Sequence, residues 1–96
     1  NTYKTKEQAE RVAFEQLLHR KLVKFAFENN DKEIDWSNYK QDKFSIAYAC
    51  HSNDLFFEIN TSNKKFGQVY FTSVEIVEKA IKEFNKDLIR YFTSNK

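Results

Sequence analysis

At 96 residues, the chain is long enough for one domain and too short for two. Sixteen basic and fourteen acidic residues nearly balance, which argues against a dedicated nucleic-acid binder and against an acidic mimic of DNA. The composition, 41% hydrophobic with ten Phe, five Tyr and one Trp, favours a folded core over disorder.

The N-terminal part predicts one long helix. Thr5-Lys6-Glu7-Gln8 is a capping box, in which the first hydroxyl accepts the fourth residue's amide hydrogen. Apolar residues recur at helical spacing over residues 9–26, and Asn29-Asn30 favours a helix end. The polar stretch 30–43 then predicts a loop, anchored to the core by Trp36.

The middle of the chain predicts three strands, because three runs alternate large and small or apolar and polar residues and short polar turns separate them. These runs are residues 44–50, 55–60 and 66–71. Short turns between neighbouring strands favour an antiparallel meander.

A second helix is expected to open at Thr72, because Thr72-Ser73-Val74-Glu75 is another capping box and an apolar stripe follows it. Asn85-Lys86-Asp87 favours a break, with a short helix continuing through Tyr91. We therefore expect residues 1–96 to form a single α+β domain: an N-terminal helix, a three-stranded antiparallel meander and a C-terminal helix broken near Asn85. Because the first residue is Asn rather than Met, we also expect a fragment of a longer protein.

The alternation divides the expected sheet into two faces. The helices are expected to cover one face, made of Ile46 or its neighbours, Leu55, Phe57, Ile59, Val69 and Phe71. The other face would carry Ala47, Phe56, Glu58, Gln68 and Tyr70. An exposed aromatic pair rimmed by polar residues is typical of a partner-binding surface. The alternative is a sheet covered on both faces.

No residue pattern predicts catalysis, a metal or a cofactor. Cys50 and His51 are neighbours in sequence, so they point to opposite faces of a strand and do not form a nucleophile and base. The acids of 31–35 lack the glycine and the final Glu of a calcium loop. A lone cysteine cannot form an internal disulfide and fits a reducing cytoplasm. No apolar run approaches the length of a membrane span, and no signal peptide is present.

Several motifs taken together resemble the C-terminal region of small uncharacterised proteins encoded by phages and prophages of Gram-positive bacteria. They are Thr5-Lys6-Glu7-Gln8-Ala9-Glu10, the stretch 28–36, the stretch 66–73, Glu75-Ile76 and Glu78-Lys79-Ala80-Ile81. In that family an aromatic-rich segment usually precedes this region, and the strand 55–60 is where this chain diverges most. The resemblance carries over no catalytic residues. It implies an accessory protein that binds a host protein in the bacterial cytoplasm.

We therefore predict a non-enzymatic protein-binding module, of which an anti-CRISPR-like inhibitor of a bacterial defence nuclease is one form. The predicted partner-binding residues are Phe56, Glu58 and Tyr70 on the open sheet face and Trp36 and Tyr39 in the loop. Basic residues of the two helices leave nucleic-acid binding as an alternative, although acids are interleaved with them. A structural or homo-oligomerising domain of a phage protein is a third hypothesis.

Overall fold

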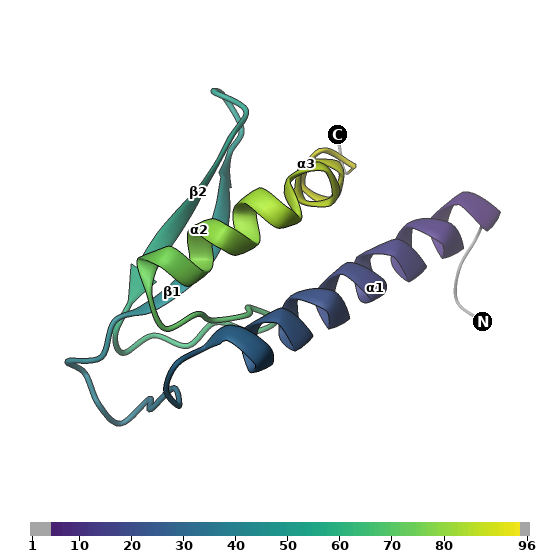
Figure 1. Cartoon of the computed structure of the whole chain (residues 1–96). Helices are drawn as coiled ribbons and strands as arrows, with labels where there is room; N and C mark the ends of the chain where they lie inside the picture. The colour runs from purple at the N-terminus through teal and green to yellow at the C-terminus, as the bar shows by residue number, and fades with distance from the viewer. Residues whose placement is uncertain (1–4, 95–96) are drawn as a thin grey trace.

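The computed structural model describes residues 5–94, which form three helices and a hairpin of two strands (Figure 1). The elements are α1 (Lys6–Asn29), β1 (Lys43–Ala49), β2 (Asp54–Asn60), α2 (Val74–Glu83) and α3 (Asn85–Thr93). The α+β class is confirmed, but the three-stranded meander is wrong, because the sheet of the described residues has two antiparallel strands. No helix within residues 5–94 is long and apolar enough to cross a membrane.

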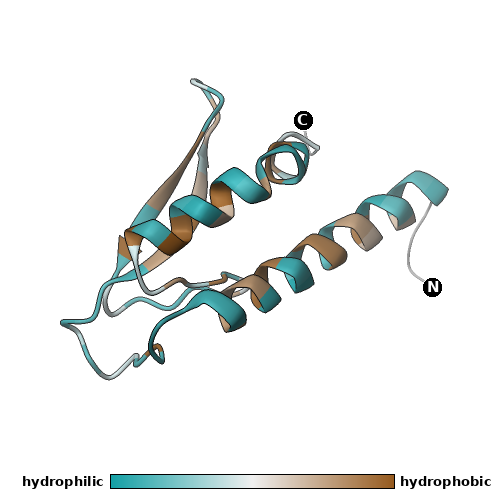
Figure 2. Cartoon of the chain, in the orientation of Figure 1, coloured by the Kyte–Doolittle hydropathy of each residue, from teal (hydrophilic) through white to brown (hydrophobic). Residues whose placement is uncertain are grey.

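α1 begins at the predicted capping box. The Thr5 hydroxyl oxygen accepts a hydrogen bond from the backbone N–H of Gln8 at 3.1 Å. At the other end, the backbone N–H of Asn30 donates to the carbonyl of Ala26, so the Asn pair closes the helix as expected. Figure 2 shows apolar residues interrupted by polar ones along α1 and α2, as one core-facing side per helix requires.

The hairpin brings apolar side chains to the face that packs on the helices. Phe44 lies opposite Ile59, Ile46 opposite Phe57, and Tyr48 opposite Leu55. Because residues directly opposite in an antiparallel pair share a face, these six side chains lie on one side of the sheet. This agrees with the predicted covered face, except that Ile59 is 55% exposed.

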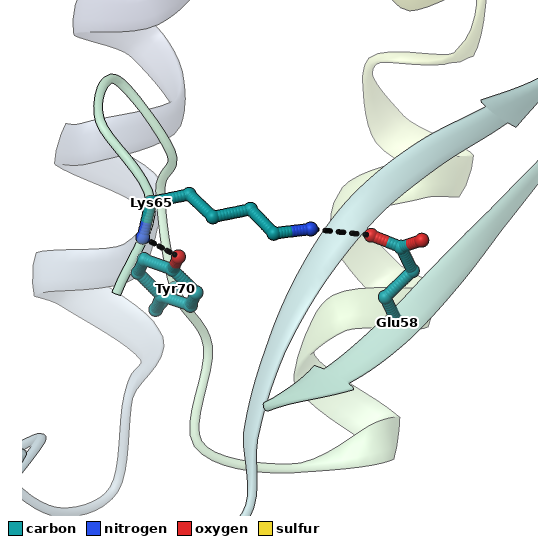
Figure 3. Close-up of polar contacts among 3 residues, drawn as sticks. All are labelled: Glu58, Lys65 and Tyr70. Atoms are coloured by element: carbon teal, nitrogen blue, oxygen red, sulfur yellow. Dashed lines mark hydrogen bonds and ion pairs between the residues drawn. The ribbon is translucent and has the colours of Figure 1, made fainter. Parts of the chain in front are cut away.

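The third strand is replaced by a loop. Within residues 66–71, Phe71 alone bridges to β1, exchanging two backbone hydrogen bonds with Phe44 at 2.8 and 2.9 Å. Gly67 has a φ of +77°, a left-handed conformation that interrupts an extended chain. The backbone N–H of Lys65 donates to the Tyr70 hydroxyl at 2.8 Å (Figure 3), so the loop closes on itself rather than on the sheet.

The start of the second helix also differs from the prediction by one residue. Ser73, not Thr72, is the N-cap of α2, and its hydroxyl oxygen accepts from the backbone N–H of Ile76. The Thr72 hydroxyl instead donates to the Asp31 carboxylate at 2.8 Å. The predicted break near Asn85 is confirmed, because α2 ends at Glu83 and α3 starts at Asn85.

The core lies where α1, α2 and the hairpin meet. It consists of Phe25, Ala26, Phe44, Phe71, Val77 and Ala80, all of them buried. The Phe25 ring meets Phe71 and Phe84 edge-on, with ring centres 6.2 and 5.7 Å apart. Edge-on contacts between aromatic rings stabilise a fold by more than the burial of their apolar area alone, so these pairs add to the stability of a small core.

Candidate protein-binding groove

The predicted binding residues do not form one surface. Tyr70 is 5% exposed, which corrects its expected place on an open sheet face. Its ring meets the Trp36 ring edge-on, with centres 4.8 Å apart. The structure therefore assigns Tyr70 and the half-buried Trp36 to the packing of the loop against the hairpin.

The same cluster contains a buried cation, Lys43. Its ammonium donates to the carbonyl oxygens of Asn38, Gln41 and Thr61 at 2.9, 3.1 and 2.9 Å. It also lies 4.9 Å from the centre of the Trp36 ring, within cation–π range. Three carbonyl acceptors and an aromatic face replace the water that the buried ammonium loses on folding. Because these groups come from the loop and from the segment after β2, the Lys43 side chain of β1 connects the loop to both strands. Nothing in the local sequence pattern indicated it.

The remaining predicted residues are exposed but separate. Tyr39 is 68% exposed in the loop, and Phe56 is 42% exposed on β2. The Glu58 carboxylate lies 3.8 Å from the ammonium of Lys65 (Figure 3). Both side chains are about half exposed, so this surface ion pair contributes little to stability.

A concave, largely apolar groove lies elsewhere, between α1, α3, β1 and the loop that replaces the third strand. It is a groove of about 720 Å³. α1 supplies Val12, Glu15, Gln16, Leu18, His19, Arg20 and Leu22; α3 supplies Leu88, Tyr91 and Phe92; Ile46, Gly67, Gln68, Val69 and Phe71 complete the lining. We call it the α1–α3 groove.

Packing holds the floor and the walls of the α1–α3 groove. Leu18, Leu88 and Phe71 are at most 4% exposed and form a rigid apolar floor. The Phe92 ring stacks on Tyr48 of β1, with centres 5.3 Å apart and planes 8° from parallel. The guanidinium of Arg90 lies 4.0 Å from the centre of the Phe14 ring and so joins α3 to α1.

One fully exposed aromatic residue is a chain neighbour of the groove lining. Phe66, with a relative exposure of 106%, directly precedes the lining residue Gly67. The sequence placed Phe66 at the start of a strand, so it was not recognised as a candidate. Phe27 of α1 is 89% exposed and lies outside the groove lining.

Two observations describe the titratable groups. Within residues 5–94 no three His, Cys, Asp or Glu side chains gather to hold a metal ion. Hydrogen bonds from the Ser37 side chain and backbone lower the pKa of the Asp35 carboxyl, which belongs to a turn of the loop. No family model matches the chain, and neither the curated proteins nor the solved structures contain a match.

Proposed function

We propose that this chain is a non-enzymatic protein-binding module whose α1–α3 groove takes the apolar side chains of a partner helix. The observation that carries the proposal is an open groove with a buried apolar floor, whose loop segment begins at Gly67, directly after the fully exposed Phe66. An exposed ring next to a preformed apolar recess supports binding by helix-in-groove contact. Its size, about 720 Å³, is suited to several side chains.

The charges around the groove favour a protein partner over nucleic acid. Its lining includes one acid, Glu15, together with Arg20 and His19, so cationic charge is not concentrated there. Nucleic-acid binding relies on clustered basic residues that neutralise phosphates.

The identity of the partner rests on the resemblance alone. If the chain belongs with the phage-encoded proteins that it resembles, its partner is a host protein in the bacterial cytoplasm. An inhibitor of a host defence system, of the anti-CRISPR kind, then acts by covering a surface of its target.

Affinity capture from a lysate of the bacterial host, using the full chain, tests this function. Phe66→Ala removes the exposed ring that directly precedes the lining residue Gly67. Phe27→Ala is the matched control, since its ring is similarly exposed and neither Phe27 nor its chain neighbours line the groove. We expect the wild type and Phe27→Ala to retain one dominant host protein that Phe66→Ala loses, with unchanged unfolding curves for both variants.

Two outcomes contradict the proposal. Equal capture by Phe66→Ala and the wild type would remove the groove from the binding surface. Co-purified nucleic acid that leaves the chain as the salt concentration rises would favour the nucleic-acid alternative instead.

A further inference from the structure

The outer edge of β2 carries main-chain groups that the fold leaves available. Phe44 of β1 exchanges hydrogen bonds with Phe71, so its N–H and C=O point away from β2. In an antiparallel pair of strands, two residues directly opposite each other behave alike. If the N–H and C=O of one point away from the partner strand, those of the other do too. Ile59 is opposite Phe44, and its N–H and C=O therefore point away from β1.

The same direction holds for every second residue along β2, so Leu55 and Phe57 also direct their main-chain groups outward. Within residues 5–94, β2 pairs with β1 alone, and no other strand lies along its outer edge. Figure 1 shows α2 across the hairpin, with the tip of the hairpin extending beyond it. An edge of this kind is a template for another strand.

We propose that a second copy of this chain pairs with that edge, β2 against β2 in antiparallel orientation, about a two-fold axis at Phe57. The inference is independent of the α1–α3 groove, which lies on other elements. It joins two hairpins into one four-stranded sheet, and sheets with more than two strands are more stable than an isolated hairpin.

Among the registers that pair at least five residues of β2 with the second copy, charge selects this one. Opposite residues of an antiparallel pair point to the same face of the sheet, and on one strand only every second residue shares a face. Two opposite copies of β2 residues are therefore an even number of positions apart, which places the two-fold axis at a residue rather than between two. An axis at Phe56 places Asp54 opposite Glu58, and an axis at Glu58 places that carboxylate opposite its own copy. Like charges directly opposite are destabilising.

An axis at Phe57 avoids both conflicts. Asp54 then lies opposite Asn60 of the second copy, and Glu58 lies opposite Phe56. Leu55 lies opposite Ile59, and Phe57 lies opposite itself. Each of Leu55, Phe57 and Ile59, whose main-chain groups point outward, thus lies opposite a residue of the second copy whose main-chain groups also point outward, so the two can exchange hydrogen bonds.

Side-chain exposure agrees with the same register. Ile59, 55% exposed, would be covered by Leu55 of the second copy, and Phe56, 42% exposed, would pack beside the stem of Glu58. A recess of about 500 Å³ between β2 and α2, lined by Leu55, Phe57 and Ile81 among others, opens beside the same strand. The second copy would thus cover apolar area as well as main chain.

Opposite charges at one position test the register. Phe56→Lys places a cation opposite Glu58 of the second copy, twice by symmetry, whereas Phe56→Glu places a like charge there. Sedimentation equilibrium of the full chain should show a dimer that Phe56→Lys tightens and Phe56→Glu weakens, each on the order of tenfold. A monomeric wild type at all measurable concentrations, or equal shifts for the two variants, would overturn the proposal.

A backbone substitution provides a second, independent measurement. Ile59→Pro removes an outward N–H without removing a bond between β1 and β2, and Ile59→Val keeps that N–H. We expect Ile59→Pro to be monomeric with unchanged circular dichroism and Ile59→Val to dimerise. A folded Ile59→Pro that dimerises as the wild type does would refute pairing at this edge.

Discussion

At the scale of single residues, Lys43 shows how this chain stabilises a long irregular loop. The loop residues 30–42 contribute no strand or helix, but two of the three carbonyls that hold the Lys43 ammonium come from it. The third, of Thr61, comes from the segment after β2. One buried side chain therefore connects the end of the loop to the segment after β2, 18 positions further along the chain.

Replacing Lys43 by Met tests this role. The thioether fills similar space but donates no hydrogen bond, so three carbonyl oxygens in a partly buried site lose their partner, at about 1–3 kcal/mol of unfolding free energy. Urea unfolding should show that loss in Lys43→Met and little change in Lys64→Met, whose exposed ammonium lies 6.0 Å from the same Trp36 ring. Equal stability of the two variants would show that the buried ammonium is dispensable.

At the scale of elements, the cap of α2 gives a prediction with a position-specific readout. Ser73→Ala removes the acceptor for the backbone N–H of Ile76 and should cost about 1 kcal/mol. Thr72→Val instead removes the hydroxyl that donates to the Asp31 carboxylate and accepts a hydrogen bond from the backbone N–H of Asp31 at 3.2 Å. Hydrogen exchange should therefore speed up at the Ile76 amide in Ser73→Ala and at the Asp31 amide in Thr72→Val. The reverse pattern would restore Thr72 as the cap.

The helices were predictable from sequence because their signals are local. Thr5 and Asn30 bound α1 through bonds to residues three or four positions away. The absence of the third strand was not predictable in the same way, since residues 66–71 keep the alternation that is typical of a strand. Its loss depends on the left-handed Gly67 and on the bond from Lys65 to Tyr70.

The candidate site was harder to predict, because it depends on contacts between distant segments. Tyr70 was assigned to an open face, but Trp36, 34 positions before it in the sequence, packs against its ring. The α1–α3 groove is lined by four separate parts of the chain, and no part carries a recognisable motif. Phe56 and Glu58 were placed correctly on the surface because the alternation of β2 is regular.

At the scale of the whole molecule, the two proposed surfaces belong to different elements. The α1–α3 groove uses the helices and the loop, whereas the dimer uses the outer edge of β2. A dimer would thus present two grooves, and a partner with two sites would bind it with higher avidity than a single site allows.

Site-specific photo-crosslinking with the captured partner protein tests the central claim, binding at the α1–α3 groove, most directly. A photoreactive residue replaces Gln16, which lines the groove, or Lys24, which is exposed on the same helix outside it. The account predicts a covalent adduct with the partner from position 16 and none from position 24. Adducts from position 24 alone, or from both positions equally, would contradict it.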